Sequence, residues 1–197
     1  MRPDFAVLIL AAGASRRLGR PKALVSVGGR TLIERAVDSA QSLGPAWIGV
    51  VVGSGATRIG AALGARRVER IVAHRWREGL GASLRAGLRA VPRSARRVLV
   101  LTVDQWAVRP RDLWRLLRAS PLGPVASAYA GIRGVPAVLP ARWTRQSRGL
   151  ASGSGARPLL EAVAAPAIPV ATAAIDLDTL EDLRALRRRT WRELNTI

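Results

Sequence analysis

Continuous apolar runs constrain the fold more than any other feature of the sequence. Phe5–Ala11, Trp47–Val52 and Arg97–Val103 consist mostly of Val, Ile, Leu and Ala, which is typical of strands buried on both faces of a parallel sheet. Segments with helical periodicity alternate with these runs, and one of them opens on a capping box at Thr31–Glu34. This alternation predicts a three-layer, Rossmann-like α/β fold with a mostly parallel central sheet. We see no internal repeat or linker and therefore expect a single domain over residues 1–197.

The remaining elements follow from the same periodicity and from turn residues. We expect further strands at Val68–Ala73, Val125–Tyr129 and Val135–Leu139, and short extended pieces at Ala167–Thr172 and Ile175–Leu177. We expect helices at residues 31–43 and 55–64 and at Leu80–Val91, Arg111–Ala119, Pro158–Ala164 and Thr179–Arg189. Residues 148–157, rich in Gly and Ser, predict a loop. Because ligands of such sheets bind beyond the carboxyl ends of the strands, a site is expected after the first and fourth strands.

Basic residues outnumber acidic ones, with 32 Lys plus Arg against 13 Asp plus Glu and a net charge of +19. A field of this sign attracts nucleic acids and small anions alike. The arginines are scattered and form no compact tract with interleaved aromatic residues, which disfavours nucleic acid as a partner. No apolar run has the length of a membrane helix, and the absence of cysteine excludes disulfides and thiolate sites. We therefore expect a cytoplasmic protein that binds small anions and no membrane.

The segment after the first strand, from Ala11 to Lys22, combines glycines, a hydroxyl group and several cations. Glycines let a ligand approach the backbone, and free N–H groups and cations suit phosphate oxygens. The segment matches neither the dinucleotide fingerprint nor the Walker loop, and its alternative interpretation is an ordinary basic turn. Lys22 argues against that alternative, because every other Lys or Arg position of the chain holds arginine. An ammonium bridges oxygens in a tight space that does not suit a planar guanidinium.

A long motif in this segment resembles a known signature. L-A-A-G-A-S-R-R-L-G-R-P-K at residues 10–22 is similar to L-A-A-G-x-S-x-R-M-G-x-P-K of the nucleotidyltransferases that activate small metabolites and cofactors with a nucleoside triphosphate. Within that family it most resembles the molybdenum cofactor cytidylyltransferases. Similar landmarks follow over nearly the whole chain: W-x-x-G-x-x-x-S-L-x-x-G-L at residues 76–88, D-Q at 104–105, G-V-P at 134–136, G-A-R at 155–157 and D-L-D-T-L-E-D-L at 176–183.

The resemblance implies transfer of a nucleotidyl group onto a small phosphorylated acceptor, with molybdenum cofactor as the expected acceptor. CTP is the favoured donor, because Ala12 stands where the related guanylyltransferases tend to carry glycine. Arg17 and Lys22 would face the phosphates, and Asp104 and Asp178 would hold Mg²⁺. Nucleotide-binding positions would be Ala11, Ala12, Gly13, Ser15, Arg16, Gly19 and Ser83.

Each of these roles has an alternative. Mg²⁺ prefers hard oxygen ligands, and Asp104 is an acid at the end of a buried strand, but it would also serve as a cap or turn former. Asp176 is another candidate ligand, and both Asp176 and Asp178 would equally suit a cap of the last helix. Ser83 has the alternative role of an inward-facing helix hydroxyl. We expect His74, the only histidine, to be solvated, since one imidazole makes no His-based metal site.

Two positions depart from the family pattern. Trp106 follows the D-Q pair where proline is usual, and we expect it to fill the core rather than to stack on a planar pterin. Gly153 stands where the motif G-D-x-G-A-R has aspartate. This loss motivates an alternative function, a catalytically impaired nucleotide- or cofactor-binding homologue that acts as a molybdoenzyme maturation factor. A nearby class of similar proteins has been assigned oxidoreductase activity, but the nicotinamide fingerprint is absent from this sequence.

Overall fold

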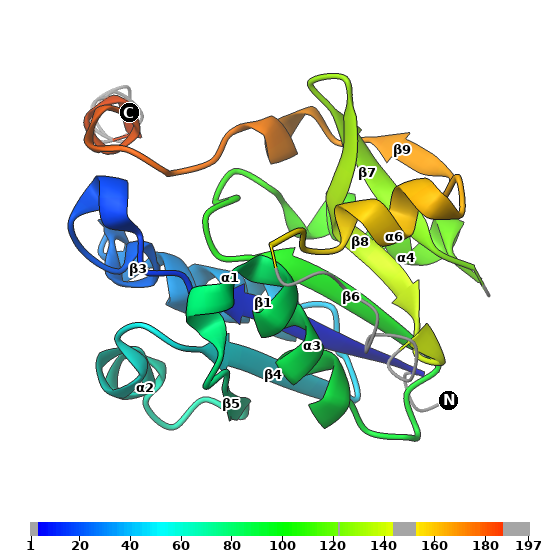
Figure 1. The fold of residues 1–197 in the computed structure, drawn as a ribbon, viewed down its shortest axis with the longest axis horizontal. Helices are drawn as coiled ribbons and strands as arrows, with labels where there is room; N and C mark the ends of the chain where they lie inside the picture. The colour runs from blue at the N-terminus through cyan, green and yellow to red at the C-terminus, as the bar shows by residue number, and fades with distance from the viewer. Residues whose placement is uncertain (1–3, 122, 144–152, 187–197) are drawn as a thin grey trace.

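The computed structural model describes residues 4–121, 123–143 and 153–186. Its main sheet has seven strands in the order β5-β4-β1-β6-β8-β7-β9 (Figure 1). The strands are β1 (Phe5–Ala11), β4 (Trp47–Val52), β5 (Glu69–Val72), β6 (Arg97–Thr102), β7 (Val125–Tyr129), β8 (Ile132–Pro140) and β9 (Ala167–Pro169). The helices are α1 (Leu32–Gln41), α2 (Ala56–Leu63), α3 (Leu80–Ala90), α4 (Pro110–Ala119), α6 (Arg157–Ala162) and a helix over residues 180–186. No helix of the described residues is long and apolar enough to cross a membrane.

The sheet is mostly parallel, as predicted. β1 pairs in parallel with β4 and β6, β4 pairs in parallel with β5, and β7 does so with β9. β8 is antiparallel to both of its neighbours, β6 and β7. The reversal between β7 and β8 uses two residues, Ala130 and Gly131, which both have positive φ angles (46° and 74°). Two successive positive φ angles are typical of the tight hairpin turn whose twist matches that of the strands.

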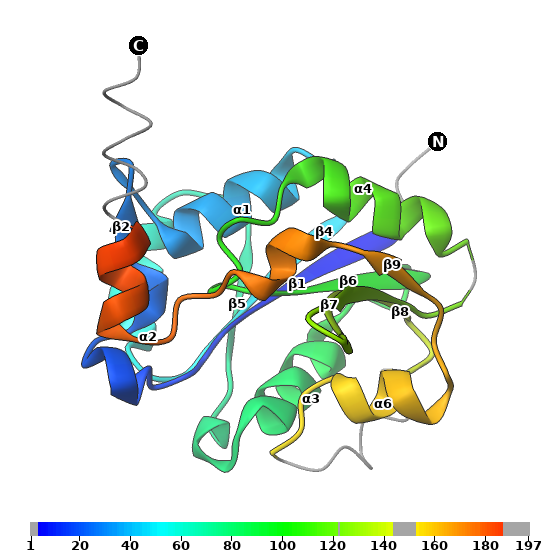
Figure 2. The same ribbon diagram turned by 90° about the horizontal axis from the view of Figure 1, so that it is seen from above.

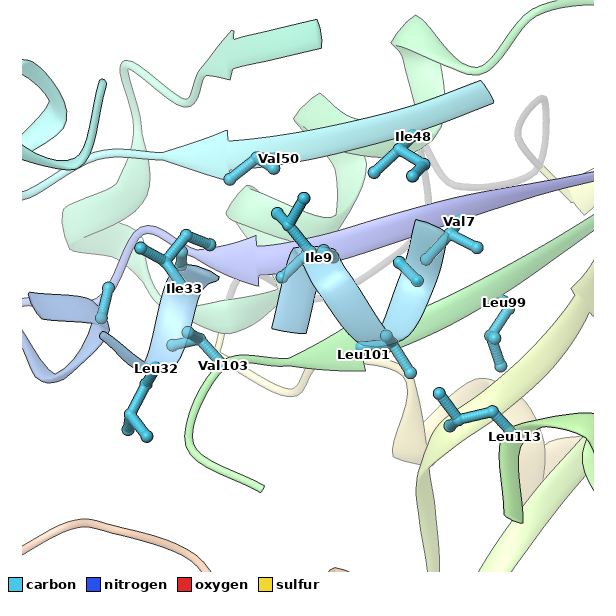
Figure 3. Close-up of a cluster of buried hydrophobic side chains, with 14 of the residues drawn as sticks. Val7, Ile9, Leu32, Ile33, Ile48, Val50, Leu99, Leu101, Val103 and Leu113 are labelled. Atoms are coloured by element: carbon cyan, nitrogen blue, oxygen red, sulfur yellow. The ribbon is translucent and has the colours of Figure 1, made fainter. Parts of the chain in front are cut away.

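Helices cover both faces of the sheet, with α1 and α4 on one face and α3 and α6 on the other (Figure 2). Alternate residues of β1 pack on the two faces of the sheet, because successive side chains of a strand point to opposite sides. Val7 and Ile9 join the core beneath α1 and α4, where Leu101 of β6 also packs (Figure 3). Leu8 and Leu10 join the second core, beneath α3 and α6. All four β1 side chains are buried, which explains the unbroken apolar run in the sequence.

Two local features of the helices follow from single residues. α1 begins with the predicted capping box: the Thr31 hydroxyl accepts a hydrogen bond from the Glu34 N–H, and the Glu34 carboxylate accepts one from the Thr31 N–H. α3 lies close to the sheet at Gly87, where a β-carbon would come within 2.7 Å of side-chain atoms of Leu8 and Val51. Close helix–sheet contact therefore depends on the missing side chain at Gly87.

Some predicted boundaries were wrong. Ala167–Thr172 is not one extended piece, because β9 ends at Pro169 and a 3-10 turn, η5 (Ala171–Ala174), follows. Ile175–Leu177 lies in no strand. A hairpin of two-residue strands, β2 (Ser26–Val27) and β3 (Arg30–Thr31), was not predicted, since two residues are too short to show a period. Residues 148–152 of the predicted loop, and the predicted helix end at Arg189, lie outside the described residues.

Candidate active site

The loop between β1 and α1 contains two short 3-10 turns, η1 (Arg16–Leu18) and η2 (Lys22–Leu24). Ser15 and Gly19 flank η1 with φ angles of 51° and 71°, in the left-handed region that glycine adopts without strain. Leu18 is buried and fastens η1 to the core. The Ser15 hydroxyl accepts a hydrogen bond of 2.9 Å from the backbone N–H of Lys22. Ser15 therefore fixes the backbone from which the Lys22 side chain extends.

Lys22 joins three segments of the chain. Its Nζ donates to Oδ2 of Asp104 at 2.7 Å and to Oδ1 of Asp178 at 2.5 Å. Asp104 follows β6, and Asp178 precedes the helix over residues 180–186. The Lys22 side chain is only 17% exposed, so these ion pairs are weakly screened by solvent compared with surface pairs. The two acids proposed as Mg²⁺ ligands are thus bridged by the lysine proposed to face the phosphates.

Arg17 completes this cluster from the solvent side. Its terminal nitrogen lies 2.6 Å from Oδ2 of Asp178, and its side chain is 71% exposed. Asp178 therefore accepts one cation on each carboxylate oxygen, Lys22 on Oδ1 and Arg17 on Oδ2. An exposed pair of this kind contributes little to stability, and the Arg17 side chain is accessible to an incoming anion.

The charges in the cluster shift the pKa of several groups. Burial lowers the pKa of Lys22, but the attraction and hydrogen bonds of Asp104, with those of Asp178, outweigh it and raise the net pKa. The hydrogen bond from Lys22 is the main reason that the pKa of Asp178 lies below its ordinary value. Burial, together with repulsion from Asp178 and Asp104, raises the pKa of Asp176. The site therefore holds a charged ammonium and a carboxylate that resists protonation.

The side chain of Asp178 does not make the cap of the last helix, which was one of the two roles considered for it. The cap of the last helix is made by Thr179 and Asp182: the Asp182 carboxylate accepts from the Thr179 N–H at 2.7 Å, and the Thr179 hydroxyl accepts from the Asp182 N–H at 3.1 Å. Asp178 contributes only its backbone N–H to Asp182, at 3.0 Å. Because the cap is satisfied by its neighbours, the Asp178 side chain is available for Lys22.

A cavity of about 470 Å³ opens beside the cluster, a volume within the range of small-molecule sites. Of the predicted nucleotide-binding positions, six line this cavity: Ala11, Ala12, Gly13, Ser15, Arg16 and Ser83. Lys22 and Asp104 line it as well. A β-carbon on Gly13 would meet no atom within 4 Å, so the space beside this residue is free for a ligand. Ser83 is buried, and Gly19 does not line the cavity.

The carboxylates suit a hard divalent cation. Oδ1 of Asp104 is buried and has no hydrogen-bond partner among the described residues, which leaves a ligand atom free. Asp178 supplies two further oxygens, of which Oδ1 is paired with Lys22 and Oδ2 with Arg17. No group of three or more acidic or His residues within the described ranges is arranged to hold a metal. Mg²⁺ is commonly bound by one or two carboxylates with phosphates and water as the other ligands, so two acids fit such an ion when phosphates are present.

Gln105 has a structural role that the sequence analysis did not assign. Its side-chain amide donates to the carbonyl of Val135 at 2.7 Å and to that of Ala173 at 3.0 Å, and its Oε1 accepts from Thr102 at 2.9 Å. These bonds join the end of β6 to β8 and to η5. Gln105 thereby fixes the backbone beside Asp104. In the sequence, Gln105 was part of the D-Q landmark but had no predicted role of its own.

Two residues, Trp106 and His74, agree with their predicted roles, and a third, Trp76, lies beside the site although no role was predicted for it from the sequence. Trp106 is partly buried and packs against the core under α1 and α4, in agreement with a filling role. His74 is exposed in the turn after β5. Trp76, known from the sequence only as part of a landmark motif, lines the 470 Å³ cavity and contacts the position that a β-carbon on Gly53 would occupy.

A cationic loop, a lysine between two carboxylates and an adjoining cavity thus lie together at the ends of β1 and β6 in an α/β sheet. Residues 7–167 match the model of the MobA-like NTP transferase domain, and the chain belongs to this family. Over 157 residues it is 33% identical to nicotine blue oxidoreductase of Paenarthrobacter nicotinovorans, covering 79% of this chain and 74% of that protein.

Two other comparisons extend this finding. The bifunctional protein GlmU of Rhodococcus opacus is 35% identical over 109 residues, which cover 52% of this chain and only 22% of that protein. The crystal structure of Rv0371c from Mycobacterium tuberculosis has a TM-score of 0.80 at 26% identity and covers 95% of this chain and all of that chain. Rv0371c has also been solved in complex with manganese, with a TM-score of 0.75 and 23% identity over 93% of this chain and 97% of that one.

Proposed function

We propose that the chain transfers a nucleotidyl group, CMP from CTP in the first instance, onto a small phosphorylated acceptor, with molybdenum cofactor as the leading candidate. The observation that carries this proposal is Lys22, which lies between Asp104 and Asp178 at the edge of a cavity walled by backbone groups of the loop after β1. Cations and oxygen ligands at one point are what a triphosphate requires.

In this reaction an oxygen of the acceptor phosphate attacks the α-phosphorus of the nucleoside triphosphate. A new P–O bond forms, the bond from the α-phosphorus to the bridging oxygen breaks, and pyrophosphate leaves with the electron pair. The chain's contribution is positioning and neutralisation of charge. Lys22 would contact the oxygens of the α-phosphate, and Arg17, on the exposed side, would bind the outer phosphates. Asp104 and Asp178 would hold a divalent ion, which supplies further positive charge at the same phosphates.

The backbone of residues 11–13 would contact the base and ribose, because no side chain fills the space beside Gly13. Ser83, buried where α3 meets the cavity, would contact the base. Ala12 in place of glycine is the basis for preferring CTP. The manganese complex of Rv0371c supports a divalent ion in a protein with this fold, and we extend it to Mg²⁺ for this chain.

The test is release of pyrophosphate from each of the four common nucleoside triphosphates, with and without molybdopterin as acceptor, in the presence of Mg²⁺. We expect release with CTP that requires both acceptor and metal, and near-complete loss in Lys22→Ala. Equal release from all four nucleotides would remove the preference for CTP. Absence of turnover with every donor and acceptor, in a folded protein, would sink the proposal.

A second candidate is a homologue that binds nucleotide or cofactor without turnover and assists maturation of a molybdoenzyme. Gly153, which replaces the aspartate of the family motif, favours it, and a β-carbon at this position would meet nothing within 4 Å. Calorimetric titration with CTP separates the two candidates, because binding without pyrophosphate release favours the second. In that case Gly153→Asp is expected to restore turnover.

The similarity to nicotine blue oxidoreductase makes oxidation–reduction the third activity to test. Its assay is consumption of NADH in the presence of a dye acceptor, with Lys22→Ala as control. If Lys22→Ala consumes NADH as fast as the unaltered chain, such chemistry takes place outside the cluster of Lys22, Asp104 and Asp178.

A further inference from the structure

A second and larger cavity, of about 570 Å³, lies on the opposite side of the end of β6. It is walled by α1 and by the start of α4, on the face of the sheet opposite α3 (Figure 2). Thr102 and Val103 line both cavities, so the end of β6 is the wall between them. Its volume lies within the range of small-molecule sites, and the nucleotide cavity does not account for it.

Arg35 of α1 supplies this cavity with an uncompensated charge. The acids one turn or less away on the same helix are already paired: Asp38 lies 2.5 Å from Arg30, and Glu34 lies 3.2 Å from Arg66. Arg35 forms no ion pair with any residue of the described ranges, and its Nε is buried without a hydrogen-bond partner there. A buried N–H left in this state has lost its hydrogen bond to water without gaining one from the protein.

Thr172 of η5 lines the same cavity and carries a second unpartnered polar atom. Its hydroxyl oxygen is buried and finds no hydrogen-bond partner within the described part of the chain. Arg109 lies at the cavity as well, exposed at the residue before α4. Buried polar groups of native proteins are nearly always satisfied, and here two orphan donors from different elements line one cavity. A ligand with acceptor oxygens would satisfy both.

The rest of the wall is partly apolar and partly polar. Trp106, Leu113, Pro136 and Ile175 form its apolar part, and Trp106 and Pro136 are rigid groups. Ser39, Gln105 and the ion pair of Asp38 with Arg30 also line it. The apolar part favours the body of an organic molecule over a fully hydrated ion. We propose that this cavity is a binding site for a small organic anion, a carboxylate or phosphate ester with a flat apolar body, whose charged group pairs with Arg35 and Thr172.

Phenyl phosphate is the probe for this proposal, measured by isothermal titration calorimetry on the full chain at fixed ionic strength. We expect one saturable site that Lys22→Met in the nucleotide cavity changes by less than about twofold. A charge-assisted hydrogen bond carries more free energy than a neutral one, so Arg35→Met is expected to weaken binding by roughly tenfold or more. Thr172→Val, which keeps the side-chain shape, is expected to weaken it severalfold. Benzyl alcohol, which lacks the charge, and inorganic phosphate, which lacks the ring, are expected to bind much more weakly.

Arg58→Met is the matched control, because Arg58 is an exposed arginine of α2 that does not line the cavity. If Arg58→Met weakens binding as much as Arg35→Met, the probe reports only the positive field of the chain and the proposal is overturned. Loss of binding in Lys22→Met would place the probe in the nucleotide cavity, and absence of saturable binding to the unaltered chain would remove the site. Circular dichroism of each variant checks its fold, and Thr172→Val decides the case if Arg35→Met does not fold.

Discussion

Replacing Lys22 with methionine tests whether the ammonium holds Asp104 and Asp178 together. Its Nζ lies 2.7 and 2.5 Å from the two carboxylates, and the three side chains are 17%, 21% and 32% exposed. Exposed ion pairs contribute about 0–1 kcal/mol, and hydrogen bonds to charged groups about 1.5–3 kcal/mol. For partial burial we take about 1–1.5 kcal/mol for each of the two bonds, so the variant is expected to lose roughly 2–3 kcal/mol. For a chain of this size that lowers Tm by roughly 4–12 °C.

Divalent ions separate this reasoning from a general loss of packing. In the unaltered chain a metal ion has to compete with the ammonium for the two carboxylates, whereas in Lys22→Met Asp104 has lost this cation and Asp178 keeps only the exposed Arg17. Mn²⁺ is therefore expected to raise the Tm of the variant more than that of the unaltered chain, while nucleotidyl transfer stays low because the lysine is missing. Differential scanning calorimetry, with and without Mn²⁺, measures both shifts.

Arg20→Met is the matched control, since Arg20 is an exposed cation of the same loop. It is expected to leave Tm within about 2 °C of the unaltered chain, as surface changes do. If Lys22→Met and Arg20→Met lose the same stability, and Mn²⁺ stabilises them equally, then Lys22 does not hold the carboxylates and the reasoning is refuted.

Three other expectations follow from the same contacts. Asp178→Asn is expected to lower turnover more than tenfold and to cost about 1–1.5 kcal/mol for the weakened bond to Lys22, whereas Asp182→Ala, which removes a helix cap, is expected to cost about 1 kcal/mol and to leave kcat nearly unchanged; kinetics and thermal unfolding together check the pair. The pKa of Asp178 is lowered from 3.8, so its stabilising effect is complete above that pH and lost as the pH falls through the lowered value. The difference in Tm between the unaltered chain and Asp178→Asn should therefore be constant from about pH 5 to 8 and shrink below 3.8. Gly87→Ala places a β-carbon 2.7 Å from core side chains and is expected to destabilise by about 1–3 kcal/mol, whereas Gly60→Ala in α2, which meets only the flexible end of an arginine side chain, is expected to be neutral or stabilising by chemical denaturation.

The sequence was most informative where a strand is buried on both faces. β1 and β4 have the predicted boundaries, because every residue from Phe5 to Ala11 contributes to one core or the other. The direction of a strand, in contrast, could not be predicted from the sequence. The antiparallel course of β8 depends on the positive φ angles of Ala130 and Gly131, and an apolar period is the same for strands of either direction.

The parts of the candidate site differ in how far the sequence revealed them. The loop and Asp104 follow buried strands and were found by position, but the approach of Asp178 to Lys22 joins residues far apart in the chain. The sequence nevertheless contains a pattern which indicates that Asp178 is not needed as the cap of the last helix. Thr179-Leu180-Glu181-Asp182 has the hydroxyl and acid spacing of a helix cap, so the cap needs no help from Asp178. The second cavity had no signal, since Arg35 and Thr172 are unremarkable residues until packing leaves them without partners.

The single lysine gains its meaning from this arrangement. Lys22 reaches oxygens of two carboxylates with one compact group while only 17% of its side chain is exposed. A guanidinium prefers to meet one carboxylate edge-on with two parallel bonds, as a flat fork does, and it is wider than the space that an ammonium fills between two acids. The one lysine of this arginine-rich chain therefore lies where two carboxylates approach a single cation. The same geometry suits a phosphate oxygen that takes the place of a carboxylate when substrate binds.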